Sequence, residues 1–393
     1  MLKLGAAQKQ ELLEFARRLV QVPSPPGGEG GVAELVRAQM QALGFHEVRV
    51  DEWGNVVGTI RGRGRSSVLF DAHMDTVPAD PSGWRHPPYA AVVEDGRLYG
   101  RGASDMKGAL AAAVYGVGLL AQAGDDFGTV HVCASVAEEA VEGPALERVL
   151  ERLQPESVVI MESTGLDIAV GQRGRAELTI ETLGRSAHTS NPALGINAVE
   201  KMAAVIRALA DLELPTDPFL GPAIAVVTDI VSEPFPGLSV VPHRCVITVD
   251  RRLVVGEEPE AVLGQVRAVL DRLAASDPEF RARVAIAEDR LTTFTGREIV
   301  APNFAPAWRI DSEHPLVTRA RAALRDAGQE PRLVTYRFCT NGSGSMGRMG
   351  IPTIGYGPGR EEVAHTADEY VDLEELYRAC EGYAALATRL SRF

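Results

Sequence analysis

Short apolar strands alternate with helical stretches along the first part of this chain, and this alternation limits the folds open to it. Strands are expected in the stretch SSVLFDA, at Thr129–Ser135 and at 157–161, with helices at 108–124 and 145–153 between them. Consecutive strands joined through helices form a parallel sheet, and such a sheet needs helices on both faces. We therefore expect an α/β fold whose mainly parallel sheet is sandwiched by helices.

The pattern changes near residue 174. From there the expected elements follow in the order βαββαβ, which is the order of a ferredoxin-like unit. The strands are expected at 175–183, 224–231, 244–253 and 282–287, and the helices at 195–212 and 259–275. A segment of about 115 residues is long enough for a domain of its own. We expect a first domain split between residues 1–173 and 290–393, with a smaller domain inserted at 174–289.

The balance of charge narrows the range of partners. The chain has 40 Lys and Arg against 53 Asp and Glu, a formal net charge of −13. Such a chain repels phosphate backbones and anionic lipids, which argues against nucleic acid or a membrane as a partner.

The cysteines and the apolar runs bear on the compartment. The four cysteines lie far apart without a C-x-x-C pair, so neither a disulfide framework nor a thiolate zinc site is expected. The first residues lack the apolar core of a signal peptide, and the uncharged run 108–124 is short for a membrane span. We expect a cytoplasmic protein.

The clearest chemical signal is a strand that ends in His-x-Asp, at His73 and Asp75. Residues i and i+2 of an extended chain share a face, and a carboxylate beside an imidazole raises its basicity toward a metal. A purely structural hydrogen bond between the two fits the same pattern. Asp105 follows a Gly-rich turn that lacks the spacing of a dinucleotide or P-loop motif. A helix N-cap is the other interpretation of Asp105.

Further side chains of the same kinds follow other strands or a Gly-rich stretch: Glu138, Glu139, Glu162 and His365. A Glu pair is usually solvent-exposed, but adjacent carboxylates beyond a buried strand are costly to bury unpaired. Imidazole and carboxylate ligands without sulfur suit a catalytic site for Zn²⁺, Co²⁺ or Mn²⁺. The number of ligands fits two ions that share one carboxylate.

Taken in order, these motifs resemble those of the M20-type di-zinc peptidases and deacylases. That family includes acetylornithine deacetylase, succinyl-diaminopimelate desuccinylase, aminoacylase and glutamate carboxypeptidase. The resemblance covers essentially the whole chain and implies a zinc-exopeptidase-like catalytic domain with an inserted lid, through which relatives often form a homodimer. It also implies a cis peptide bond after Asp105.

The resemblance implies a role for each of these residues. His73 and Glu162 would bind one zinc, and Glu139 and His365 the other, with Asp105 bridging both. Glu138 matches the general base, and Asp75 the carboxylate behind His73.

Residues that act on the substrate are implied in the same way. His188 matches a histidine that helps to hold the oxyanion, commonly from the partner subunit, and Arg252 matches an arginine that binds a substrate carboxylate. Asn197, Asn341 and Gly342 are the other implied substrate contacts. There are departures, because Ser239 stands where the family usually has Asn, and the loop at 340–347 lacks the usual Asp. The run 355–359 also resembles a bacterial branch of hydrolases linked to selenium metabolism.

The expected function is hydrolysis of an amide bond in an N-acyl amino acid or a dipeptide-like small molecule with a free carboxylate. Two divalent ions, with Zn²⁺ preferred over Co²⁺ or Mn²⁺, would activate a water. Two alternatives remain open on the residues alone. One is a two-metal phosphoesterase, and the other is a non-catalytic amino-acid-binding protein on the same fold.

Overall fold

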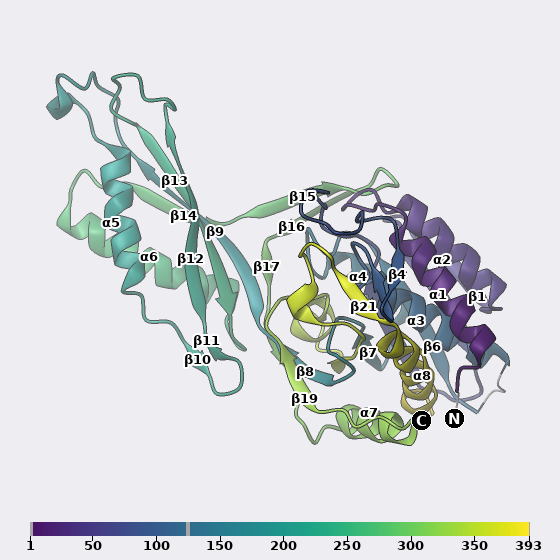
Figure 1. The fold of residues 1–393 in the computed structure, drawn as a ribbon. Helices are drawn as coiled ribbons and strands as arrows, with labels where there is room; N and C mark the ends of the chain where they lie inside the picture. Colours follow the sequence, from purple (N-terminus) through teal and green to yellow (C-terminus); the bar gives the residue numbers. More distant parts are fainter. Residues whose placement is uncertain (1–2, 123–125, 393) are drawn as a thin grey trace. The chain divides into compact units, whose positions relative to one another are not determined.

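The structure is a computed structural model that describes residues 3–122 and 126–392. The described chain divides into two compact units, which are drawn in Figure 1. The first unit comprises Met1–Gln172, Arg290–Ala301 and Trp308–Phe393, and the second comprises Arg173–Asp289 and Pro302–Ala307.

The first unit is built on a nine-stranded sheet. In spatial order its strands are β1 (Glu47–Val50), β2 (Val56–Arg61), β6 (Thr129–Ser135), β3 (Ser67–His73), β7 (Ser157–Ile160), β20 (Thr353–Gly355), β8 (Ile168–Gln172) and β18 (Trp308–Arg309), and β19 (Leu333–Tyr336) also pairs with β8. The strands β6, β3, β7 and β20 at the centre are parallel. Antiparallel pairs on both sides make the sheet mixed. The predicted parallel core is thereby confirmed.

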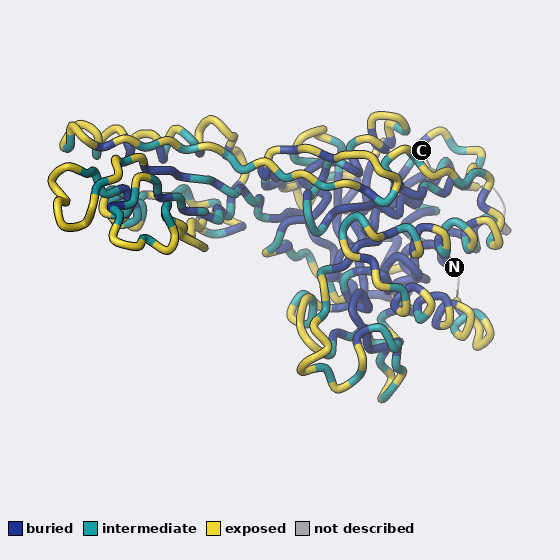
Figure 2. The backbone as a smooth tube through the Cα atoms, turned by 90° about the horizontal axis from the view of Figure 1, so that it is seen from above, coloured by how far each residue is buried: buried dark blue, intermediate teal, exposed yellow. Residues whose placement is uncertain are grey.

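Helices cover both faces of this sheet. Because successive side chains of a strand point to opposite faces, Val68 and Phe70 of β3 belong to the larger core, whereas Leu69 packs in a smaller core with α4. The helices are α1 (Ala6–Val20), α2 (Gly30–Ala42), α3 (Lys107–Gly118), α7 (Pro315–Asp326) and α8 (Leu373–Leu390) beside the larger core, and α4 (Pro144–Leu153) beside the smaller one. Figure 2 shows much of the buried chain inside this unit. The predicted α/β sandwich is confirmed.

Helix α3 lies at the centre of the larger core. All of its residues are buried, because its many Ala and Gly side chains are small enough for close packing against neighbouring helices. The helix predicted at 108–124 thus ends at Gly118 and continues as a 3-10 turn at Leu119–Gln122, and its last two residues lie outside the described residues. Among the described helices, none combines the length and the apolar character needed to cross a bilayer.

A small sheet lies beside the turn that carries Asp105. Its three antiparallel strands are β4 (Val92–Glu94), β5 (Arg97–Tyr99) and β21 (Tyr370–Asp372). The Gly-rich turn follows β5 directly, and β21 leads into α8.

The second unit has the predicted βαββαβ order. Its elements are β9 (Gly174–Leu183), α5 (Ala198–Ala210), β12 (Ile224–Glu233), β13 (Arg244–Leu253), α6 (Pro259–Ser276) and β14 (Ala282–Ile286). The strands form an antiparallel sheet in the order β12-β13-β9-β14, with β17 (Phe304–Ala305) pairing with β9. The helices share one core with the sheet. This strand order is that of a ferredoxin-like unit.

Four further short strands form two pairs. They are β10 (Thr216–Asp217) with β11 (Gly221–Pro222), and β15 (Glu288–Thr292) with β16 (Glu298–Pro302).

Candidate metal centre

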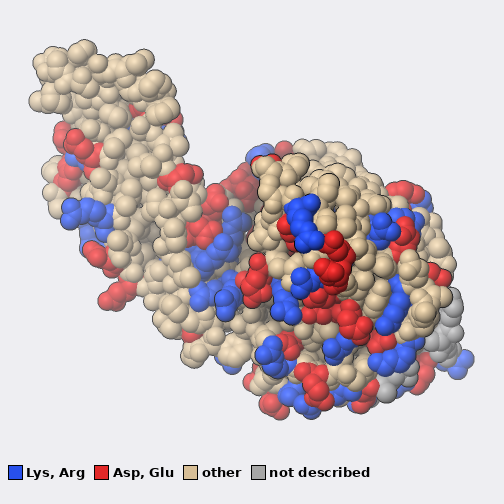
Figure 3. Space-filling view, viewed as in Figure 1, with Lys and Arg blue, Asp and Glu red and all other residues tan. Residues whose placement is uncertain are grey.

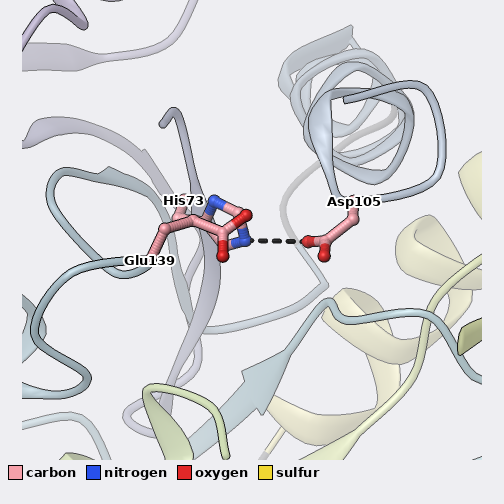
Figure 4. Close-up of side chains that lie close together, drawn as sticks. All are labelled: His73, Asp105 and Glu139. Atoms are coloured by element: carbon pink, nitrogen blue, oxygen red, sulfur yellow. Dashed lines mark hydrogen bonds and ion pairs between the residues drawn. The ribbon is translucent and has the colours of Figure 1, made fainter. Parts of the chain in front are cut away.

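The site begins at the end of β3, where His73 is buried. Its Nδ1 lies 2.8 Å from the backbone oxygen of Asp75, which leaves Nε2 to face the acidic side chains of the site. That Nε2 is 3.0 Å from Oδ1 of Asp105, 3.4 Å from a Glu162 oxygen and 3.8 Å from a Glu138 oxygen. Figure 4 shows His73, Asp105 and Glu139 gathered from three separate elements. His73 therefore lies beside three acidic side chains that are far from it in the sequence, at positions 105, 138 and 162.

Asp105 lies between two histidines. Its Oδ1 is the oxygen near Nε2 of His73, and its Oδ2 is 3.2 Å from Nε2 of His365. The same nitrogen of His365 is 3.1 Å from Glu139. A carboxylate that offers one oxygen to each of two imidazoles has the position of a bridging ligand.

Backbone hydrogen bonds fix the Asp105 turn. One oxygen of the buried Glu369 accepts the backbone N–H groups of Ser104 and Asp105, at 2.9 and 3.0 Å. Its other oxygen accepts a hydrogen bond of 2.6 Å from Arg101, which neutralises its charge. The peptide bond between Asp105 and Met106 is cis, as the resemblance implies. Sequence reasoning assigned no role to Glu369, since an Asp-Glu pair in a loop carries no distinctive signal.

The Glu138–Glu139 segment is held by its own backbone. The N–H groups of Glu138 and Glu139 donate to the carboxylate of Asp75, at 3.2 and 2.9 Å. The N–H of Ala137 donates to Glu29 at 3.1 Å, and that of Val136 to Asn55 at 3.0 Å. Four consecutive N–H groups are thus tied to buried side-chain oxygens, so both glutamates enter the site from a rigid segment.

These hydrogen bonds give Asp75 a different role from the expected one behind His73. The ring of His73 is oriented by the backbone oxygen of Asp75, while the Asp75 carboxylate lies 3.6 Å from the ring nitrogen and serves the glutamate segment. Glu29, at the start of α2, was missed by sequence reasoning. It follows a Pro-Gly loop, and no local pattern connects it to residue 137.

Burial and mutual repulsion govern the protonation of the acidic groups. Burial raises the pKa of Glu162 to about 7, with Asp105 adding to the effect, and it raises that of Glu138 well above its usual value. For Asp105, burial acts in the same direction, but hydrogen bonds with His365 and His73 outweigh it and lower the pKa. Hydrogen bonds with Asp105 and Glu139 raise the pKa of His365 to about 10. Burial and mutual repulsion therefore destabilise the ionised carboxylates, and a nearby positive charge reduces this destabilisation.

These side chains fit divalent cations. Ligand atoms of His73, Asp105 and Glu139 lie within 4.8 Å of one another, and those of His73, Glu138 and Glu162 form a second such group. One oxygen of Glu138 is buried without a hydrogen-bond partner, which is an acceptor left for a bound species. Nitrogen and oxygen donors without sulfur suit a catalytic rather than a structural metal site.

The loop at 340–347 belongs to the first unit, and its residues Asn341 and Gly342 are buried. Asn341 is only 2% exposed, and its amide donates to Asp71 and Ser135 while its oxygen accepts the N–H of Gly143. Gly342 is buried close to the Trp308 ring. All polar atoms of the Asn341 side chain are thus committed within the protein, so we replace the expected substrate contact with a positioning role behind β3 and β6.

The remaining predicted residues belong to the second unit. His188 is exposed, and its Nδ1 lies 2.8 Å from the hydroxyl of Ser190. Asn197 caps α5 by accepting the N–H groups of Val199 and Glu200, which explains its presence without a substrate. Arg252 is half-buried and donates from Nε to Asp250 at 2.9 Å.

Comparison with known proteins agrees with this geometry. The sequence profile of peptidase family M20/M25/M40 matches residues 69–389. The uncharacterized protein YgeY of Escherichia coli (strain K12) is 33% identical over 383 residues, which covers 96% of this chain and 93% of that protein. N-formyl-4-amino-5-aminomethyl-2-methylpyrimidine deformylase of Bacillus subtilis (strain 168) is 26% identical, covering 94% and 92%. Succinyl-diaminopimelate desuccinylase of Rhodospirillum centenum is 30% identical, covering 67% and 73%.

Solved structures share the fold. The aminopeptidase PepT of Bacillus cereus superposes with a TM-score of 0.76 at 22% identity, covering 97% of this chain and 98% of that one. The dinuclear metal-binding peptidase YXEP of Bacillus subtilis gives a TM-score of 0.74 at 18% identity, covering 98% and 99%.

Proposed function

The chain belongs to peptidase family M20/M25/M40, and from this premise we propose that it hydrolyses an amide bond in an N-acyl amino acid or dipeptide-like substrate with a free carboxylate. The observation that carries the proposal is the carboxylate of Asp105 between His73 and His365, with one oxygen toward each. In this proposal the first unit is the catalytic domain and the second is the lid.

We assign the metal ligands as His73, Asp105 and Glu162 for one ion and Asp105, Glu139 and His365 for the other, with Zn²⁺ as the main candidate and Co²⁺ or Mn²⁺ as alternatives. When bound there, such ions would polarise the substrate carbonyl and lower the pKa of a water.

The protein supplies the proton transfers. Glu138 accepts a proton from the attacking water, and its buried oxygen without a hydrogen-bond partner is available for that role. Glu138 then donates that proton to the leaving nitrogen, since an amine anion is too basic to leave. Asp75 and Glu29 hold the segment that presents Glu138.

Two residues of the second unit complete the proposal on the strength of the resemblance. His188 would donate a hydrogen bond to the oxyanion. Arg252 would bind the substrate carboxylate through its terminal nitrogens, because only Nε is engaged with Asp250.

We also propose a homodimer formed through the second unit. Strand β12 lies at an edge of its sheet, with exposed apolar side chains such as Ile230 (52%) and Val231 (57%). An exposed apolar edge strand favours pairing with another strand. Figure 3 shows few charged side chains on the upper part of this unit. A cytoplasmic location is part of the proposal, since all four cysteines are free and buried.

A substrate panel tests the proposed function. The purified chain, supplied in turn with zinc, cobalt and manganese, is assayed on N-acetyl, N-succinyl and N-carbamoyl amino acids and on dipeptides. Each substrate is paired with its C-terminal amide, and phosphate esters are included. We expect amide hydrolysis that needs the metal and the free carboxylate. Turnover of phosphate esters alone would favour the phosphoesterase alternative and contradict the proposal.

A further inference from the structure

The second unit contains a pocket of about 290 Å³ between its sheet and its two helices. The pocket is lined from β9, β12, β13, α5 and α6, by side chains such as Ile180, Val227 and Val266. All of the lining side chains are aliphatic except those of Arg251 and Gln265. This pocket shares no residue with the metal centre, and the inference from it does not rest on the proposed function.

Arg251 occupies a position where the fold calls for an apolar residue. Along β13 the buried residues alternate, so Arg251 shares its face of the sheet with Ile247 and Val249, while Arg252 is on the other face. Arg251 is only 2% exposed. One terminal nitrogen donates to Glu257 at 2.5 Å and to Gln265 at 3.0 Å, but its Nε has no hydrogen-bond partner.

An unpartnered N–H on a buried guanidinium needs an explanation. Arginine stays charged in proteins, and leaving one of its donors unsatisfied in an apolar setting is costly. The neighbouring acceptor oxygens bind other groups: the second oxygen of Glu257 accepts the N–H of Val254 at 2.9 Å, and the oxygen of Gln265 accepts from a terminal nitrogen of Arg251. None of these oxygens accepts from Nε, so the Arg251 side chain keeps a donor without a partner at the polar end of the pocket.

We propose that this pocket binds a small monocarboxylate with a branched aliphatic or aromatic body. The carboxylate would accept hydrogen bonds from Arg251 and from the amide of Gln265, while the body lies against the aliphatic wall. At about 30 Å³ for each water-sized group, the volume holds on the order of ten non-hydrogen atoms. The site is a ligand site of the second unit, separate in its residues from the proposed substrate contact at Arg252.

Calorimetric titration of the full chain tests the proposal, with 4-methylpentanoate and 3-phenylpropionate as probes and 4-methylpentan-1-ol as the neutral control. We expect saturable binding of the acids, weakened at least about tenfold for the alcohol and for Arg251→Gln, because a charge-assisted bond is lost. Val227→Phe fills the pocket from β12 and should weaken binding as strongly. Because Arg251→Gln removes a buried ion pair, circular dichroism is used to check that this variant is folded. If Arg251→Gln is unfolded, the loss of probe binding in Val227→Phe tests the proposal instead.

Arg252→Gln is the matched control on the opposite face of β13, and it should leave probe binding unchanged. Loss of binding in Arg252→Gln but not in Val227→Phe would place the acid at the substrate contact and overturn the proposal. Equal binding of acid and alcohol, or no binding up to about 10 mM probe, would overturn it too. None of these outcomes depends on catalytic activity, so failure here is distinguishable from failure of the proposed function.

Discussion

Replacing Glu138 by Gln separates its two possible roles. The side chain is buried, with one oxygen 3.8 Å from His73 and the other without a partner. This places it as near to the cluster as a metal ligand, yet the proposed function makes it the general base. Gln has the same shape and keeps the backbone hydrogen bond to Asp75, so the variant changes the charge and little else.

The expected loss is kinetic. A general base contributes about 10²- to 10⁴-fold to turnover, equivalent to about 3–5 kcal/mol of transition-state stabilisation. The other groups around His73 are closer, with Asp105 at 3.0 Å and Glu162 at 3.4 Å, so both ions should be retained. We expect kcat to fall by that factor while KM changes little.

The assay combines steady-state kinetics with metal analysis of the purified variant. Glu162→Gln is the matched control, because it removes a proposed ligand of the same type and should lose one ion. If Glu138→Gln turns over at a wild-type rate, the assignment of the base is wrong. If Glu138→Gln loses an ion as Glu162→Gln does, Glu138 is a ligand instead.

Three further predictions concern the segment that carries Glu138, the acid stability of the first unit and the assembly. Glu29→Ala removes the acceptor of the Ala137 N–H, so it should lower the free energy of unfolding by about 1.5–3 kcal/mol and reduce kcat. Glu29→Gln keeps an acceptor and should restore part of kcat. Wild-type kinetics in Glu29→Ala would show that the hydrogen bond from Ala137 to Glu29 does not position Glu138. Burial, aided by Arg61, lowers the pKa of His131 to about 4 from 6.5, so the unfolded chain binds a proton first as pH falls. The free energy of unfolding should therefore fall by roughly 3 kcal/mol as the pH is lowered from 6.5 to 4. Urea unfolding of the wild type and of His131→Gln over this pH range measures the effect, and an equally large fall in His131→Gln would contradict it. Ile230→Lys adds a charge to the edge of β12 and should convert the dimer to a monomer at micromolar concentration, as measured by light scattering; an unchanged mass would exclude this edge.

The metal-centre residues differ in how far the sequence could place them. His73 ends β3, while Glu139 and Glu162 follow β6 and β7, and these three strands are adjacent and parallel in the sheet. The carboxyl ends of parallel strands meet at one edge, so this grouping follows from the strand pattern itself. Asp105 and His365 come from loops. The residue types marked both as candidate ligands, but only the resemblance to known metallopeptidases assigned them to the same ion.

The supporting contacts could not be predicted. Glu29 and Asn55 reach the backbone N–H groups of Ala137 and Val136 from more than 80 residues away. A hydrogen bond between a side chain and a backbone N–H far away in the chain produces no recognisable sequence pattern. The resemblance implied Asn341 as a substrate contact, and its hydrogen bonds in the interior of the first unit could not be predicted for the same reason.

The sequence by itself determined the alternation of strands and helices, the order of the inserted unit and the residue types at the strand ends, because each follows from local periodicity. Only the tertiary structure decided that Asp105 stands between two histidines and that Arg251 lies buried in an aliphatic pocket. These are relations between segments far apart in the chain, and they arise when compaction brings those segments within a few ångströms and removes the water around them.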